Sequence, residues 1–254
     1  MAELKEFLEK RRVTEKTQTS VTHIMMEAPK GKYHIKEEDE SILYKMLAKT
    51  KSVLSLLETP TSTYIPILVD VDLHSPEKQT LYTYSQIENL IHAYQSVLKN
   101  IVENVSDQQL TCFLFEKPAP YFDEKSKVFK HGFHLHFPYL FVTRLQQEYN
   151  ILPAVKKKLK EFWDADPDKI PCHYDELIDE CIYKGKGKSW FLLGCGKKKI
   201  PYSCSRIYNH KTVMVQKEEI LPEAKEEQIE LFSIHLSNKK KPYIGQIVAS
   251  EGMF

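Results

Sequence analysis

The stretch Tyr64-Ile-Pro-Ile-Leu-Val-Asp-Val-Asp-Leu-His74 decides how the rest of the chain is interpreted. Its apolar residues alternate with a period of two, which in a β-branched run predicts a strand. Asp70 and Asp72 then share one face, opposite Val69 and Val71. Two carboxylates this close repel each other and are costly to desolvate, so a cation is expected between them. Mg²⁺ and Mn²⁺ are the first candidates, although an acidic strand edge that faces water gives the same pattern.

The composition is that of an ordinary globular protein. The 254 residues allow one large domain or two small ones, and 36 basic against 35 acidic side chains leave a net charge of +1. This balance neither favours nor excludes nucleic acid, so the distribution of charge matters more than its total. The N-terminus lacks the apolar core of a signal peptide, and no apolar run reaches membrane length. We therefore expect a soluble intracellular protein with no membrane association.

The five cysteines are an odd number without the close pairs of a disulfide scaffold. The spacings Cys172-x8-Cys181 and Cys195-x8-Cys204, with His173 nearby, leave a zinc site open. Small buried side chains explain the same residues better, so zinc is not expected.

Hydrophobic periodicity and turn residues divide the chain into alternating helices and strands, with no internal repeat. Helices are expected over 2–12, 37–58, 85–105, 143–163 and 217–230. Strands are expected over 21–26, 32–35, 64–74, 110–115, 128–138, 190–193, 203–208 and 211–216.

The strand expected over 128–138 has a titratable face. Lys130, Gly132, His134 and His136 alternate with apolar residues and so share one side. His131 falls on the other side and is expected to be a packed or edge histidine.

The segment from Ile178 to Lys199 combines an acidic residue with glycines and lysines. Asp179 precedes a loop whose lysines are separated by glycines, and a short strand then leads into a second Gly-Lys cluster. Glycine lets backbone amides approach an anion while lysine supplies charge, which indicates a phosphate or nucleotide surface. The Walker pattern is absent, and a flexible basic hairpin is the alternative interpretation.

Taken together, these three segments supply what nucleotidyl transfer by two metal ions requires. Three carboxylates can hold two cations roughly 3.5–4 Å apart. Histidine and lysine donors can meet the remaining phosphate charge.

At this point the chain resembles the archaeo-eukaryotic primase superfamily, in particular the primase domain of the primase-helicases of large nucleocytoplasmic DNA viruses, poxviruses included. Leu-Val-Asp70-Val-Asp72-Leu is similar to the acidic motif of the family, and Lys130-His-Gly132-Phe-His134 to its Lys-x-Ser-x-His motif. Ile-Asp179-Glu-Cys-Ile-Tyr183 matches the third motif. The resemblance spans residues 64–200, and Phe232-Ser-Ile-His235 is similar to the end of the family's primase region.

The resemblance implies a role for each matching residue. Asp70, Asp72 and Asp179 would ligate two Mg²⁺ or Mn²⁺ ions, and His134 would bind the triphosphate of the incoming nucleotide. Lys130, Gly132, Lys188 and Lys197 would assist. Gly132 replaces the frequent serine of the family, and Lys188 and Lys197 stand where an arginine and a lysine are common. The choice between Lys186 and Lys188 stays open.

The resemblance also implies an α/β (α+β) fold with a mixed or largely antiparallel, RRM-like sheet flanked by helices. A second small sheet would come from residues 21–35, or from 110–130 with the later hairpin. Residues 1–235 would form the primase catalytic domain, and 236–254 a tail or linker toward a helicase region. Such a domain makes primers on single-stranded DNA from nucleoside triphosphates, with a helicase in cis or in trans. If viral, it would act at replication sites in the host cytoplasm or nucleus.

Two alternatives remain open from the sequence. His134-Leu135-His136 is a His-hydrophobe-His motif, as in rolling-circle nucleases, and Tyr149 would then be the nucleophile. The other alternative is a non-catalytic RRM-like module that binds single-stranded DNA.

Overall fold

The computed structural model describes residues 2–15, 20–165, 172–185, 187–236 and 243–248. Within these ranges the larger sheet has seven strands, arranged around β7, which pairs with β4, β5, β6 and β11. The strands are β4 (Tyr64–Ser75), β5 (Cys112–Glu116), β6 (Tyr121–Asp123), β7 (Val128–Thr143), β9 (Ser203–Tyr208), β10 (Met214–Val215) and β11 (Tyr243–Ile244). All pairs are antiparallel except β7 with β11. The expected mixed, largely antiparallel sheet is confirmed.

Strands β4 and β7 form the long antiparallel pair at the centre of this sheet. Asp70 lies opposite His134, and Asp72 lies opposite Gly132. Because directly opposed residues project from the same face, the acidic motif and the histidine motif share one side of the sheet, as the two-residue periodicity predicts. The partners on the other side, including Val69 and Leu135, are fully buried.

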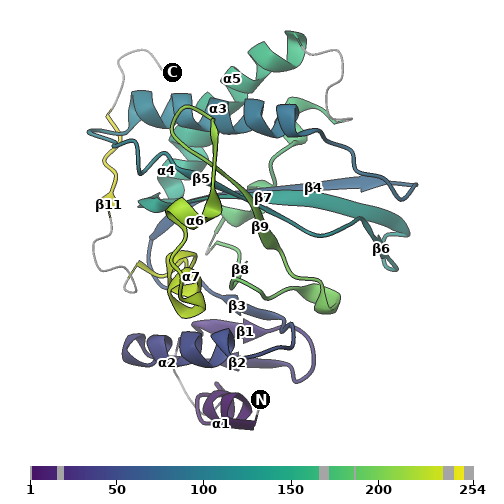
Figure 1. The fold of residues 1–254 in the computed structure, drawn as a ribbon, viewed down its shortest axis with the longest axis vertical. Helices are drawn as coiled ribbons and strands as arrows, with labels where there is room; N and C mark the ends of the chain where they lie inside the picture. The colour runs from purple at the N-terminus through teal and green to yellow at the C-terminus, as the bar shows by residue number, and fades with distance from the viewer. Residues whose placement is uncertain (1, 16–19, 166–171, 186, 237–242, 249–254) are drawn as a thin grey trace.

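Helices cover that apolar side (Figure 1). They are α3 (Tyr84–Ile101), α4 (Arg144–Gln146), the π-helical turn η1 (Gln147–Ile151) and α5 (Leu152–Ala165). Thr83 begins α3 with a capping box, in which its side chain accepts from the Gln86 amide. The apolar face of β4 and β7 is buried in the core beneath these helices, so the polar face is the side of this strand pair on which a site can form. None of the described helices has both the length and the apolar character needed to cross a bilayer.

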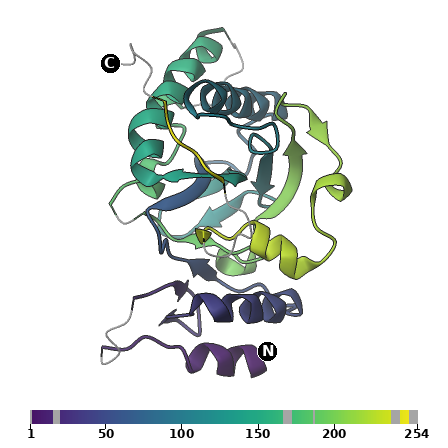
Figure 2. The ribbon, with the colours of Figure 1, turned by 90° about the vertical axis from the view of Figure 1, so that its left-hand side faces the viewer.

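A second sheet lies against the polar side of the first, and Figures 1 and 2 show it between the larger sheet and the N-terminal helices. It is ordered β2 (Gly31–Tyr33), β1 (His23–Met25), β3 (Leu56–Glu58) and β8 (Trp190–Phe191). Helices α1 (Ala2–Glu9) and α2 (Glu37–Ala48) pack beside it, in a core that includes Leu43 and Leu56. The expectation that residues 21–35 build a second sheet is confirmed. Residues 110–130 and the later hairpin belong to the larger sheet instead.

The single helix expected over 37–58 is wrong. Helix α2 ends at Ala48, and Leu56–Glu58 forms β3 because its backbone pairs with β1 on one side and β8 on the other. The apolar residues of this segment satisfy a helical period as well as a buried strand, which periodicity alone does not distinguish.

The remaining elements are short. The helix expected over 217–230 is divided into α6 (Lys217–Ile220) and α7 (Lys225–Leu231), with Pro222 between them. The 3-10 turns are η2 (Tyr174–Glu176), η3 (Glu180–Ile182) and η4 (Lys197–Lys199). Residues Tyr243–Ile244, within the segment expected to be a tail, form β11 and pair with β7.

Candidate active site

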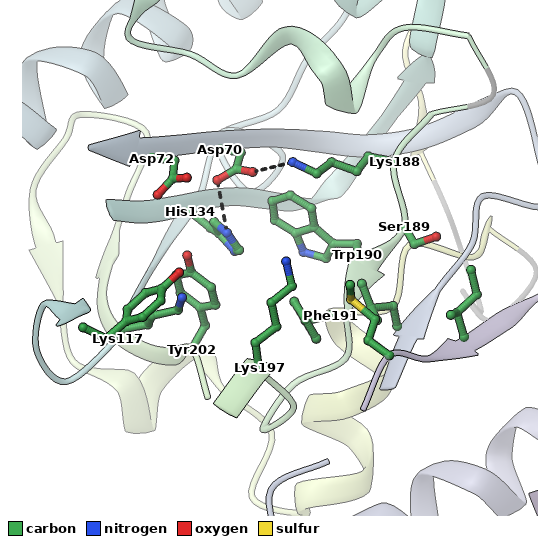
Figure 3. Close-up of a pocket in the computed structure, with 14 residues that line it drawn as sticks. Asp70, Asp72, Lys117, His134, Lys188, Ser189, Trp190, Phe191, Lys197 and Tyr202 are labelled. Carbon is green, nitrogen blue, oxygen red and sulfur yellow. Dashed lines mark hydrogen bonds and ion pairs between the residues drawn. The ribbon is translucent and has the colours of Figure 1, made fainter. Parts of the chain in front are cut away.

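A pocket of about 310 Å³ opens between the two sheets, next to the polar face of β4 and β7. Asp70, Asp72 and His134 line it from the larger sheet (Figure 3). Ile24, Met26 and Leu57 line it from the second sheet, which makes that wall apolar. The rest of the lining is Lys117, Tyr121, Lys188, Ser189, Trp190, Phe191, Lys197 and Tyr202. Its size and its combination of apolar walls with convergent charges are those of a small-molecule site.

Asp70 and His134 form the centre of the pocket. The Nε2 atom of His134 lies 3.3 Å from the Oδ1 atom of Asp70. The imidazole ring stacks on Tyr202 at a centroid distance of 3.7 Å and contacts Trp190 at 4.3 Å. Aromatic rings on both sides fix the orientation of His134, so its polar edge stays directed toward the carboxylate.

Asp179 is brought to Asp70 by the chain before η3. Its amide donates a hydrogen bond of 2.9 Å to the Asp70 carbonyl, and its side chain caps η3 by accepting from the Cys181 amide. The fold thus places the acidic residue expected from the third motif beside Asp70, although more than a hundred residues separate the two in the sequence.

Lys188 joins these two carboxylates. Its Nζ atom lies 2.8 Å from Asp179 and 3.5 Å from Asp70. Burial alone would raise the pKa of Asp70, but His134 and Lys188 outweigh it and hold that pKa below its ordinary value. Lys188 lowers the pKa of Asp179 in the same way, against the effect of burial. Both carboxyl groups are therefore kept ionised.

Asp72 lies farther out on β4 and is exposed. The Nζ atom of Lys130 lies 3.6 Å from the Asp72 carboxylate and 3.8 Å from that of Asp123. The Nε2 atom of His74 lies 3.3 Å from Asp72. Lys130 thus neutralises the acidic motif rather than lining the pocket. Gly132, which is paired with Asp72 in the ladder, has no side chain and is not part of the pocket lining. A Cβ atom at Gly132 would collide with the carbonyl oxygen of Val71, so the serine common in the family does not fit here.

Two more lysines reach the pocket. Lys197 was expected from the sequence, and its side chain extends toward the space below Asp70 (Figure 3). Lys117 was not expected, since it stands alone in a Pro-rich turn after β5. Its Nζ atom lies 4.0 Å from the centroid of the Tyr121 ring and 4.9 Å from that of Tyr202, and the residue is buried. In the sequence, the one feature that could have indicated Lys117 is its position as a lone lysine between Phe115 and Pro118.

The donor set of this site fits a hard divalent cation. Asp70 and Asp179 already share a single cationic group, the ammonium of Lys188, and Asp72 is adjacent on the same strand face. Carboxylate oxygens are the ligands that Mg²⁺ and Mn²⁺ prefer. A metal ion that contacts both Asp70 and Asp179 must displace Lys188 toward the pocket, where phosphate oxygens would receive it.

The residues of the rolling-circle alternative are not brought together. His136 shares a strand face with His134 but is only 1% exposed, and its ring contacts Phe115 and Phe232. Tyr149 belongs to η1, in the helical layer on the opposite side of the sheet. His131 is a packed histidine, as expected, and stacks on Tyr82. Lys186 lies outside the described residues.

Two sheets flanked by helices, with two carboxylates and a histidine on neighbouring strands facing the smaller sheet, define an α+β fold with a candidate active site between its sheets. Residues 22–208 match the family model of the C962R protein N-terminal AEP domain, where AEP denotes archaeo-eukaryotic primase. This chain therefore belongs to the C962R-type archaeo-eukaryotic primase family.

Curated relatives come from large DNA viruses and carry helicase names. The chain is 26% identical over 202 residues to the candidate helicase 121R of Invertebrate iridescent virus 3 and 27% identical over 218 residues to 184R of Invertebrate iridescent virus 6; each match covers 74% of this chain and 21% of the relative. It is 29% identical over 190 residues to L207/L206 of Acanthamoeba polyphaga mimivirus, covering 72% of this chain and 19% of that protein. The chain thus spans about a fifth of the length of these relatives.

Proposed function

We propose that this chain is a DNA primase domain that joins nucleotides into primers on single-stranded DNA by metal-dependent nucleotidyl transfer. The observation that carries the proposal is that Asp70, Asp72 and His134 line one pocket with several lysines, and that one of these, Lys188, joins Asp70 to Asp179. Family membership gives the fold; the reaction is inferred from these side chains.

Each group has a task in this reaction. Asp70, Asp72 and Asp179 would hold two Mg²⁺ or Mn²⁺ ions. Bound there, the cations would lower the pKa of the attacking hydroxyl and offset the charge of the triphosphate. His134 would bind phosphate oxygens, and Lys117, Lys188 and Lys197 would supply the remaining positive charge.

The apolar half of the pocket is suited to the base and sugar of the nucleotide. Trp190 and Phe191 come from β8, Leu57 comes from the neighbouring strand β3, and Met26 directly follows β1. Aromatic faces stack on bases without strong sequence preference, which matches an enzyme that must accept every template-directed nucleotide. The template strand and a helicase, in cis or in trans, are the partners this proposal requires.

The test is primer synthesis on unprimed single-stranded DNA. The protein is incubated with labelled ribonucleotides or deoxynucleotides and Mg²⁺ or Mn²⁺, and the products are separated on a denaturing gel. We expect short products from the parent and none from Asp70→Asn or Asp72→Asn, with unchanged circular dichroism. Products of equal yield from either variant would refute the assignment. Retention of single-stranded DNA binding without synthesis by the parent would instead favour the non-catalytic module.

A further inference from the structure

A second group of metal-ligand side chains lies away from the pocket, on the other face of the second sheet. Ile24 and Leu57 line the pocket, and their neighbours His23 and Glu58 therefore project from the opposite face. His23 and Glu58 are paired across β1 and β3, and His235, after α7, joins them. One potential ligand atom from each of the three residues lies within 4.8 Å of the others. All three side chains are at most 1% exposed.

His23 has one ring nitrogen without a partner. Its Nδ1 atom lies 2.9 Å from the hydroxyl of Thr22, and that hydroxyl lies 3.3 Å from the carbonyl oxygens of Tyr33 and Ile35. The Nε2 atom has no hydrogen-bond partner among the residues that the structure describes, and it lies 3.9 Å from the Oε1 atom of Glu58. A buried polar atom left in this way is costly, which makes it the independent sign of a missing ligand.

His235 is oriented as metal-binding histidines usually are. Its Nε2–H donates to the carbonyl oxygen of Thr59 at 2.8 Å, and its Nδ1 faces the Oε1 atom of Glu40 at 2.5 Å. A histidine ligand commonly donates its second ring N–H to a backbone carbonyl, which fixes the tautomer and leaves the other nitrogen for the metal. In His235 that other nitrogen is Nδ1, so a metal bound there would displace the Glu40 carboxylate from its hydrogen bond.

Glu58 is held in place by its own donors. The Oε1 atom accepts from the hydroxyls of Tyr44 and Ser233, both at 2.8 Å, and Oε2 accepts from the amide of Ile234 at 2.7 Å. Such contacts orient a ligating carboxylate and are as much part of a metal site as the ligands.

We propose that His23, Glu58 and His235 form a structural Zn²⁺ site. Two imidazoles with a carboxylate favour zinc over the magnesium or manganese expected in the pocket. With Glu58 and Glu40 both ionised, a divalent cation in place of the His235 Nδ1 proton leaves the buried group electrically neutral. The expectation against zinc rested on the cysteines, which take no part in this cluster.

The site would hold two distant parts of the chain together. His23 and Glu58 belong to the second sheet, and His235 belongs to the segment after α7 that resembles the end of the primase region. Because the opposite face of β1 and β3 is a wall of the pocket, the metal would hold that wall in position without touching a nucleotide. Zinc closes many small structural sites in this manner.

The test measures zinc in the full chain purified from zinc-supplemented cells. By elemental analysis we expect about one zinc per chain in the parent and in the double variant Asp70→Asn/Asp72→Asn, which lacks the pocket carboxylates. His23→Gln and His235→Gln should retain roughly a tenth of that amount or less, since loss of a ligand greatly weakens the site. His131→Gln, at a buried histidine outside the cluster, is the control and should keep its zinc.

X-ray absorption at the zinc edge is measured on the parent protein, so its result does not depend on whether the variants fold. The spectrum should show two imidazoles, oxygen ligands and no sulfur. A parent without zinc, a spectrum with sulfur ligands, or full zinc content in folded His23→Gln would overturn the proposal. None of these results depends on primase activity, so the zinc site and the proposed function are tested separately.

Discussion

Lys188 and Asp179 are joined by a hydrogen bond of 2.8 Å, and through it the lysine occupies the position between two carboxylates that a metal ion would take. The ammonium thus serves as the counterion of these two carboxylates. In the proposed reaction, a metal ion would replace it there and the same group would bind the triphosphate, because lysine binds phosphate as a flexible point charge.

We predict that Lys188→Met binds Mn²⁺ more tightly than the parent when no nucleotide is present. The ammonium competes with the metal for Asp70 and Asp179, and loss of a half-exposed ion pair is worth about 1 kcal/mol, or roughly fivefold in affinity. Titration of Mn²⁺ followed by electron paramagnetic resonance measures this. Lys184→Met is the matched control, because Lys184 pairs with Glu180 instead. Equal or weaker Mn²⁺ binding by Lys188→Met would contradict this role.

His134→Ala should raise the KM for the nucleoside triphosphate by about tenfold or more, because a charge-assisted hydrogen bond to phosphate contributes about 1.5–3 kcal/mol. Nucleotide binding can be followed by the fluorescence of Trp190, whose ring lies 4.3 Å from His134. His131→Ala, on the other side of the same strand, should leave KM within twofold. A normal KM for His134→Ala would remove this residue from the nucleotide site.

Lys117 gives the reaction a dependence on pH. Burial lowers the pKa of Lys117 to about 8. The side chain is therefore a charged ammonium below that pH and loses its proton above it. We therefore expect kcat/KM for the nucleotide to fall as the pH rises through about 8. Lys117→Arg should abolish this fall, since a guanidinium stays charged, and Lys117→Met should be weak at every pH. If kcat/KM of Lys117→Arg fell with rising pH just as in the parent, the fall would belong to another group.

Gly132→Ser should destabilise the fold even though serine is common at this position in the family. The added Cβ meets the Val71 carbonyl, which is backbone and must move with β4. Such overpacking costs about 1–3 kcal/mol, measurable by urea denaturation, and it displaces Asp72 from its register. Gly194→Ser is the comparison: its Cβ meets no atom within 4 Å, and only its φ of +78° is strained, at about 1–2 kcal/mol. Full activity of Gly132→Ser would show that the strand pair is more tolerant than this contact implies.

Alternation along two stretches of sequence was enough to predict that Asp70 and Asp72 share a face, and that Lys130, Gly132 and His134 do so too. Register was not predictable in this way, because the pairing of Asp70 with His134 depends on the bulge between Pro66 and Ile67 and on the path of the whole chain. Asp179 was suggested as a third carboxylate by the types of residue present and by resemblance to the family, but no local pattern indicates that it lies beside Asp70.

Other parts of the site depend on contacts that no local pattern encodes. Lys117 and Tyr202 reach the pocket from turns, and the buried position of Lys117 follows from the rings packed around it. The helical period of residues 37–58 conceals the strand Leu56–Glu58, and with it the pairing of Glu58 with His23. In the sequence, Glu40 cannot be distinguished from the other acidic residues in the first turn of α2. Its burial against His235 arises only when α2 packs beside the second sheet.

The most direct measurement is the structure of the protein crystallised with Mn²⁺ and a non-hydrolysable nucleoside triphosphate, with anomalous scattering used to locate the metal. The account predicts two manganese positions roughly 3.5–4 Å apart, held by Asp70, Asp72 and Asp179, with the triphosphate against His134 and Lys197. Manganese bound away from these three carboxylates, or a triphosphate outside the pocket, would contradict it.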